Sequence, residues 1–487
     1  MRHQSKVLAL LLLLTVGAIL VQGYHPGLED DAYYLAAIKH DLNPALFPHD
    51  AAFFQVLFQA TVFDKMIAAS LRLTHLPLGW GIFLWQFAAT FLILWGCFRI
   101  ARRCFEEEYA QWAAVTMVAA LLTLPVSGSG LLLTDQHLQP RSLATALILA
   151  AIVAVLDGRK WLAAVLLLAA FPLHLNMAPF GVSYCVFLAW SPQKKTQPSY
   201  ATVAAGLAFP LQWIFEPAND TWRRAEATRN FYFLLRWHWY EWLGIIGPLV
   251  IVWWYRRLAC GRGSTVLAKV AERTVYFGLF QFAVALVLML PPRLERLRSF
   301  EPMRFLHLVY LLFVLLSGGL LARYFLKRNV IRWLLVFVPL SAGMFYAQRQ
   351  LYPATAHLEL PGVPSHNPWV EAFRWISHNT PIDSYFALDP DYMEMPGEDA
   401  HGFRALAERS VLADAIKDPC IVVRVPSLGP RWLREMNAQQ GWKTFQRQDF
   451  LHLKEQFGVD WVLVSAPAVA RMKCPYDNGT LAVCRVD

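Results

Sequence analysis

Long apolar segments recur through most of the chain and constrain its fold more than any other feature of the sequence. They begin at Val7–Val21, and the last one ends at Tyr346. The segments after the first are Leu78–Phe98, Ala110–Val126, Ser142–Leu156, Trp161–Leu173, Ala178–Trp190, Tyr200–Phe215, Trp242–Tyr255, Thr274–Leu290, Phe305–Leu321 and Val330–Tyr346. The segments predict about eleven transmembrane helices. The number is approximate because a perpendicular span needs about 20 apolar residues and several segments are shorter than that.

The composition supports an integral membrane protein with the lipid bilayer as its first partner. Apolar residues make up 56% of the chain and charged residues 16%, against the roughly 25% charge of soluble domains. The net charge of +9 does not indicate nucleic-acid binding, since Arg and Lys gather at the ends of apolar segments. The first segment, which follows Arg2 and Lys6, also fits a signal peptide, but no small-x-small site precedes Tyr24. We therefore favour an uncleaved helix.

Loop charge orients the helices, because cytoplasmic loops carry an excess of Lys and Arg. Basic residues such as Arg102, Arg103, Arg256 and Arg257 place the N-terminus in the cytoplasm. An odd number of spans then places the C-terminus outside, and we expect a bacterial inner membrane with a periplasmic C-terminus.

Two predicted outer loops are rich in arginine, although the positive-inside rule places basic residues on the cytoplasmic side. Their arginines are Arg223, Arg224, Arg229 and Arg236 in one loop and Arg293, Arg296, Arg298 and Arg304 in the other. Guanidinium groups bind phosphate oxygens in a bidentate manner, which would explain arginine at the outer face. The alternative is that some of them extend from the apolar region to the interface.

The pattern predicts two domains. A transmembrane domain covers residues 1–347, and its first outer loop, residues 22–77, contains apolar residues at helical spacing from Phe53 to Ile67. These predict an amphipathic helix at the membrane interface, or a short helix packed between spans. A small α/β domain on the outer side covers residues 364–487.

The predicted α/β domain has recognisable local signals. Asn367-Pro368 opens a helix, and a later helix ends at Gly458. Asp477-Asn478-Gly479 predicts a hairpin turn. The expected strands are Ser384–Leu388, Ile421–Val425, Trp461–Ser465 and Leu481–Val486. Cys474 and Cys484 would pair in an oxidising compartment.

Three adjacent carboxylates, Glu29, Asp30 and Asp31 (the acidic triplet), lie just beyond the first apolar segment. Their mutual repulsion and partial desolvation would raise at least one pKa, or would recruit a positive partner or a divalent cation such as Mg²⁺ or Mn²⁺. A carboxylate so placed can accept a proton from a hydroxyl group. The alternative is a solvated turn in which Asp30 caps a helix beginning near Ala32.

A second predicted outer loop adds Asp135, His137 and Arg141, which could complete a site with the acidic triplet or form a polar turn. His174 and His307, at or within apolar segments, are more typical of hydrogen-bonded core histidines than of ligands. The predicted spans hold almost no charged residue at their centres, which argues against an ion-coupled transporter.

The layout resembles the GT-C superfamily of polytopic glycosyltransferases, which includes protein O-mannosyltransferases and lipid-linked sugar transferases. The resemblance rests on one helix, a long outer loop that opens with the acidic triplet, an interfacial helix, about ten further spans and an outer C-terminal domain. It implies an inverting enzyme that uses a polyprenyl-phosphate sugar. Asp30 or Asp31 would then be the catalytic carboxylate, Asp135 a second acidic residue, and Arg293, Arg298 and Arg304 phosphate ligands.

The first hypothesis is therefore a membrane glycosyltransferase that moves a sugar to an envelope or protein acceptor on the outer face. The alternative is a non-catalytic membrane protein whose outer domain binds a partner in envelope assembly. In that case the acidic triplet could be replaced without loss of function.

Overall fold

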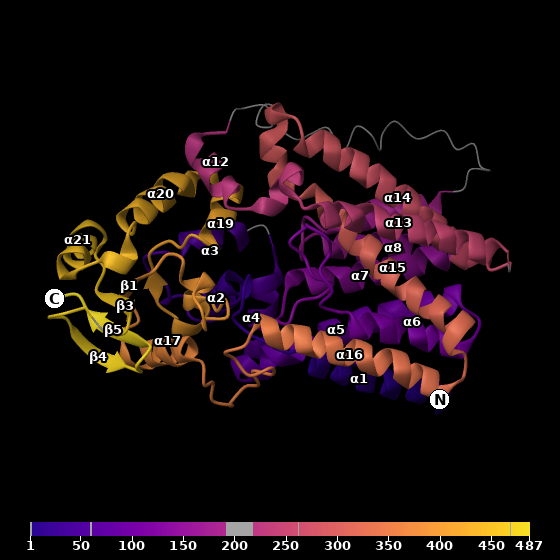
Figure 1. The fold of residues 1–487 in the computed structure, drawn as a ribbon, viewed down its shortest axis with the longest axis horizontal. Coiled ribbons are helices and arrows are strands. Elements are labelled where there is room, and N and C mark those ends of the chain that lie inside the picture. The colour runs from indigo at the N-terminus through magenta and orange to yellow at the C-terminus, as the bar shows by residue number, and fades with distance from the viewer. Residues whose placement is uncertain (1, 59–60, 191–217, 262, 468) are drawn as a thin grey trace.

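The apolar segments form helices that lie side by side in a bundle, and the chain then continues into a smaller domain at one end of it (Figure 1). The computed structural model describes residues 2–58, 61–190, 218–261, 263–467 and 469–487. The predicted segment Tyr200–Phe215 lies outside the described residues. The other apolar segments coincide with helices, because continuous apolar residues without interior charge satisfy their backbone groups best in that form.

The helices of the bundle and of its outer loops have the following bounds: α1 Arg2–Gln22, α2 Asp31–Leu42, α3 Ala52–Phe58, α4 Phe63–Thr74, α5 Leu78–Cys104, α6 Glu108–Ala120, α7 Pro140–Leu156, α8 Lys160–Ala170, α9 Ala178–Ala189, α12 Asp220–Ala227, α13 Trp239–Cys260, α14 Thr265–Met289, α15 Phe305–Leu321 and α16 Val330–Leu351. Short 3₁₀ turns η1 (Asn230–Tyr232), η2 (Leu234–Arg236), η3 (Pro292–Phe300) and η4 (Pro302–Arg304) lie in the outer loops, and a π turn η5 (Ala322–Leu326) follows α15.

Within the described residues, six helices have the length and composition to cross a membrane. They are Gln4–Gln22, Leu78–Cys104, Trp239–Cys260, Thr265–Met289, Pro302–Leu326 and Val330–Leu351. Helices α7, α8 and α9 are apolar but shorter. A multi-pass membrane protein is therefore supported, whereas the predicted total of about eleven spans is not reached by these criteria.

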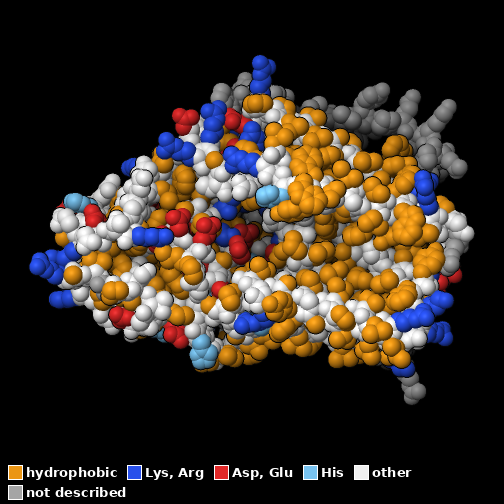
Figure 2. All heavy atoms as spheres, viewed as in Figure 1, with side chains coloured by type: hydrophobic (Ala, Val, Ile, Leu, Met, Phe, Trp, Pro, Cys, Tyr) orange, Lys and Arg blue, Asp and Glu red, His pale blue; other side chains and the backbone are white. Residues whose placement is uncertain are grey.

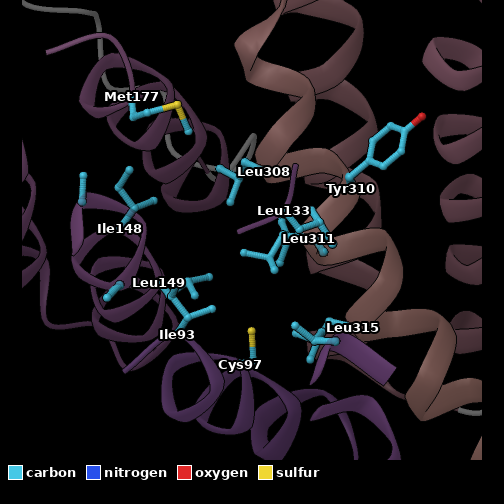
Figure 3. Close-up of a cluster of buried hydrophobic side chains, with 14 of the residues drawn as sticks. Ile93, Cys97, Leu133, Ile148, Leu149, Met177, Leu308, Tyr310, Leu311 and Leu315 are labelled. Atoms are coloured by element: carbon cyan, nitrogen blue, oxygen red, sulfur yellow. The ribbon is translucent and has the colours of Figure 1, made fainter. Parts of the chain in front are cut away.

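Buried side chains from α5, α7 and α15 meet in the interior of the bundle (Figure 3). Ile93 and Cys97 of α5, Leu149 of α7, and Leu311 and Leu315 of α15 are at most 1% exposed. Apolar side chains also cover the outer surface of the bundle, whereas polar side chains dominate the smaller domain (Figure 2). Since lipid tails are as apolar as these side chains, that outer surface suits a bilayer.

The smaller domain, residues 364–487, is called the soluble domain because polar side chains dominate its surface. It is an α/β unit around a five-stranded sheet of order β2-β1-β3-β5-β4. Strands β1 and β2 and strands β1 and β3 pair in parallel, while β5 pairs antiparallel with both β3 and β4. Its elements are α17 Pro368–Asn379, β1 Tyr385–Leu388, η6 Tyr392–Glu394, α18 Phe403–Ala407, β2 Ser410–Val411, α19 Asp418–Arg424, η7 Pro426–Leu428, α20 Gly429–Ala438, η8 Trp442–Thr444, α21 Arg447–Phe457, β3 Trp461–Ser465, β4 Lys473–Asp477 and β5 Leu481–Arg485.

Local signals predicted several of these elements correctly. Asn367 caps α17 by accepting hydrogen bonds from the amides of Trp369 and Val370, which stabilises a helix by about 1 kcal/mol. Gly458 ends α21 in the left-handed conformation, at φ 80°. The hairpin between β4 and β5 and the Cys474–Cys484 disulfide are also present.

Two predicted elements are wrong. The apolar residues Ile421–Val425 do not form a strand, because Asp418–Arg424 is the helix α19. Pro419 suits the first turn of a helix, and packing of α19 on α3, α12 and α20 overrides the strand preference of its β-branched residues. The predicted single helix from Phe53 to Ile67 is divided between α3 and α4.

Candidate functional site

The acidic triplet is held between the bundle and the soluble domain. The Glu29 amide donates to the carbonyl of Ala400 at 2.8 Å, and the Gly402 amide donates to the carbonyl of Gly27 at 2.8 Å. Gly27 has φ 87°, a conformation that favours glycine. The first outer loop is thus fixed to the soluble domain by backbone hydrogen bonds on either side of Leu28, at the start of the acidic triplet.

The three carboxylates of the triplet have different surroundings. Asp31 is 1% exposed and accepts a hydrogen bond from the Gly27 amide at 2.7 Å, and burial raises its pKa. Asp30 is partly exposed and lines a cavity. Glu29 has φ 52°, which is uncommon for a residue with a side chain.

Lys417 of the soluble domain forms ion pairs with two of these carboxylates. Its Nζ lies 2.5 Å from Oε2 of Glu29 and 3.1 Å from Oδ1 of Asp30. Burial by itself raises the pKa of the Asp30 carboxyl, but the Lys417 ammonium outweighs burial and holds that pKa well below its usual range. Asp30 is therefore ionised at neutral pH.

The cavity beside Asp30 has a volume of about 250 Å³ and draws its walls from six parts of the chain. These are the start of α2, Thr61 before α4, the start of α7, the connection between α8 and α9, the segment before α15 and the end of α19. Its charged and imidazole side chains are Asp30, Arg141, His174, Arg304 and Arg424. Figure 2 shows acidic and basic side chains gathered in a hollow between the apolar bundle and the polar domain. The cavity thus joins residues that are far apart in sequence.

The three arginines of the cavity share two carboxylates. Arg141 forms an ion pair with Asp135. Glu301 forms ion pairs with both Arg304 and Arg424, and it accepts a hydrogen bond from Arg424 at 3.1 Å. Two guanidinium groups against one carboxylate leave a positive charge in excess at this wall. Such an excess favours an anionic ligand, and arginine matches the geometry of phosphate oxygens.

Not all of the predicted site residues line the cavity. Asp30, Arg141 and Arg304 do, and Asp135 supports Arg141. His137 is buried, with its Nε2 2.9 Å from Nε2 of Gln139. The catalytic and binding roles given to these residues stay predictions.

Two further predicted phosphate ligands, Arg293 and Arg298, are also absent from the cavity lining. Arg298 pairs with Glu226 of α12 at 3.0 Å, and Arg293 is exposed. A neighbouring pair, Arg223 with Glu295 at 3.0 Å, also joins the two arginine-rich outer loops. These ion pairs give several of the outer arginines a structural reason to be there.

Three residues were not predicted for the site. His174 lines the cavity, with Nε2 3.5 Å from Nη1 of Arg304, although its position favoured a core histidine. The sequence signal that could have placed His174 in the site was the polar interruption between two apolar segments at this position. Arg424 lies within the segment that was predicted to be a strand, Lys417 lies just before it, and nothing local connects either residue with Asp30. His307, by contrast, is a core residue 2.8 Å from the carbonyl oxygen of Leu133.

The acidic triplet does not fit a divalent cation. Lys417 occupies Glu29 and Asp30, and Asp31 is buried against the Gly27 amide. Within the described ranges, no group of three or more His, Cys, Asp or Glu side chains could hold a metal ion. We derive no catalytic step from a metal.

The bundle of apolar helices and the cavity lined by three arginines define the chain as a polytopic membrane protein with a cationic cavity at one end of its bundle. Residues 59–214 match the family model of dolichyl-phosphate-mannose-protein mannosyltransferases, which supports a glycosyltransferase of the GT-C superfamily. The match begins after the acidic triplet and ends before Arg304 and the soluble domain. No curated protein matches the chain.

Proposed function

We propose that the protein transfers a sugar from a polyprenyl-phosphate donor to a hydroxyl group of an envelope or protein acceptor at the outer face of the membrane. The observation that carries the proposal is that Asp30, Arg141 and Arg304 line one cavity between the bundle and the soluble domain. A carboxylate and guanidinium groups in one cavity supply the two charges that glycosyl transfer from a phosphate requires.

The transfer is a single displacement. The Asp30 carboxylate accepts the proton of the acceptor hydroxyl while that oxygen forms a bond to the anomeric carbon of the sugar. The bond between the anomeric carbon and the phosphate oxygen breaks, and its electron pair leaves with the polyprenyl phosphate. Arg304 and Arg141 stabilise the charge that grows on the departing phosphate. A single displacement inverts the anomeric centre.

The apolar part of the cavity suits the lipid chain of such a donor. Leu173, Leu175, Phe300 and Val423 line it together with the charged residues. Leu175 and Phe300 are exposed at the surface, where apolar side chains face lipid in a membrane protein. The phosphate and sugar would then occupy the charged end while the polyprenyl chain continues toward the bilayer.

We place the soluble domain on the outer side of a bacterial inner membrane and the N-terminus in the cytoplasm. The Cys474–Cys484 disulfide supports this orientation, since disulfides persist in oxidising compartments such as the periplasm. With this orientation the basic residues in the last turns of α5 (Arg102 and Arg103) and α13 (Arg257) lie on the cytoplasmic side, as the positive-inside rule requires.

The test is sugar transfer by purified protein reconstituted in liposomes. The donors are radiolabelled dolichyl-phosphate-mannose and a panel of undecaprenyl-phosphate sugars, and the acceptor is a crude envelope fraction. Asp30→Asn should lower the rate by about 10²–10⁴, the usual contribution of a general base. The matched control is Asp220→Asn, whose side chain is 92% exposed in an outer helix and should not alter the rate. Full activity of Asp30→Asn, or no transfer by the unmodified protein from any donor, would refute the proposal.

A further inference from the structure

The helix α19 carries a basic residue at each end, and both basic residues reach the site. Lys417 precedes α19 and contacts Glu29 and Asp30, and Arg424 ends α19 and lines the cavity. The Lys417 side chain is 6% exposed and that of Arg424 is 20% exposed. Seven residues at 1.5 Å each span about 10 Å, so one short helix places both cations along the site.

The position of α19 is fixed by contacts with the outer loops of the bundle. Nε1 of Trp222 in α12 donates to the carbonyl of Val423 at 2.9 Å. Arg404 donates to both carboxylate oxygens of Asp418 at 2.8 and 3.0 Å, and also to Asp50 in the first outer loop. The two cations are therefore held by a docked helix rather than by a free loop.

Burial commits the Lys417 ammonium to its carboxylate partners, because a buried ammonium without partners costs several kcal/mol. Glu29 and Asp30 are those partners, and the contact at 3.1 Å fixes one oxygen of Asp30. The other titratable or charged groups that face Asp30 are Asp31, Tyr33, Tyr34, His137, Arg141 and Arg229. Lys417 donates a hydrogen bond to Asp30, so it determines both the orientation and the ionisation of that carboxylate.

Arg424 adds charge where the proposed reaction creates it. It shares Glu301 with Arg304, so its guanidinium is not fully neutralised. A sugar phosphodiester carries one negative charge, and the polyprenyl phosphate that leaves carries up to two. A cation beside that phosphate therefore interacts more strongly with the transition state than with the bound donor.

We propose that the soluble domain completes the catalytic site through α19, with Lys417 as the positioning residue for Asp30 and Arg424 as a substrate-binding residue for the donor phosphate. This inference rests on the proposed function. It makes the soluble domain part of the transferase site, so that the bundle without a docked α19 has an incomplete site.

The first test is the pH dependence of transfer by the full-length protein. In Lys417→Met, Asp30 loses the cation that favours its ionised form, so activity on the acid side should fall at a higher pH than in the unmodified protein. Lys417→Arg restores the charge and should return the profile toward its original position. A defect that is merely structural would lower the amount of active protein at every pH without moving the profile.

The second variant, Arg424→Gln, should lower kcat by about 10²–10³, as loss of one preorganised donor does, with a smaller change in KM for the donor. Arg447→Gln is the matched control, because Arg447 lies at the exposed start of α21. An unchanged kcat in Arg424→Gln, or an unshifted pH profile in Lys417→Met, would overturn the inference.

A measurement without turnover separates this inference from the proposed function. A water-soluble carbodiimide joins an amine to a carboxylate in contact with it, and mass spectrometry of the digested protein identifies the linked peptides. Lys417 should link to Glu29 or Asp30, and Lys39 should link to Glu408, 2.6 Å away, as the positive control. If the Lys39 link forms and the Lys417 link does not, α19 is not docked as we infer. If Asp30→Asn stays active, the proposed function fails whatever the cross-links show.

Discussion

Arg404 joins the first outer loop to the soluble domain, and its removal should loosen the contact that builds the site. Its guanidinium donates to Asp418 at 2.8 and 3.0 Å and to Asp50 at 2.5 Å. The side chains of Arg404, Asp50 and Asp418 are 8%, 0% and 3% exposed. Arg404→Met puts an unbranched apolar side chain in place of the guanidinium and leaves the buried carboxylates of Asp50 and Asp418 without their cation. Asp414, whose Oδ2 lies 3.9 Å from Nη1 of Arg404, loses it too.

The cost follows from burial. Removing one partner of a buried ion pair destabilises a protein by about 3–5 kcal/mol, because the other charge stays buried and unpaired. A factor of ten corresponds to about 1.4 kcal/mol, so the ratio of docked to undocked soluble domain should fall by at least about two orders of magnitude.

Hydrogen exchange measures this ratio directly. The amides of Glu29 and Gly402 donate across the contact, to Ala400 and Gly27, so they exchange when the contact opens. Their protection should fall by about 10² or more in Arg404→Met and should not change in Arg447→Met, where the arginine is exposed.

Neutralising Asp50 and Asp418 tests whether unpaired buried charge causes the loss of protection. The triple variant that adds Asp50→Asn and Asp418→Asn to Arg404→Met removes the charge of the two carboxylates closest to Arg404, so it should recover much of the lost protection. A change of less than threefold in Arg404→Met would refute the reasoning, as would a triple variant no better protected than Arg404→Met.

Further predictions concern the docking of the soluble domain, the pH dependence of its stability and the metal dependence of transfer. Gly402→Ala places a Cβ 2.4 Å from Ala32 and should destabilise docking by about 1–3 kcal/mol, which would appear as faster proteolysis of the soluble domain. Gly247→Ala, with open space around it, should not change the rate of proteolysis, and equal proteolysis of both variants would contradict this prediction. Burial raises the pKa of Glu398 to about 8, so the domain should lose stability as pH rises from about 4.5 through 8, and Glu398→Gln should reduce that loss in thermal unfolding. Burial lowers the pKa of His401, but its hydrogen bond to Glu359 outweighs burial and raises that pKa to about 9. The loss of stability with rising pH should therefore continue through pH 9. Transfer should be unaffected by EDTA, because Lys417 already occupies Glu29 and Asp30; a loss restored by Mg²⁺ or Mn²⁺ would contradict this.

The sequence alone determined the features that depend on neighbouring residues. Uninterrupted apolar segments specify helices in a bilayer, Asn367-Pro368 specifies the start of α17, and Asp477-Asn478-Gly479 specifies a hairpin. The position of the acidic triplet beyond the first helix was equally visible. Periodicity, capping and turn chemistry act over a few residues, so they can be recognised without knowledge of the fold.

Only the tertiary structure decided which distant groups meet. Lys417 lies 387 positions after Asp30, and Arg424 lies 123 positions after Glu301, so no local pattern relates these partners. The same packing turned the β-branched residues of α19 into a helix and paired Arg298 with Glu226 outside the cavity. Long-range ion pairs depend on how the bundle and the soluble domain dock, because a buried charge is stable only where that docking supplies its partner.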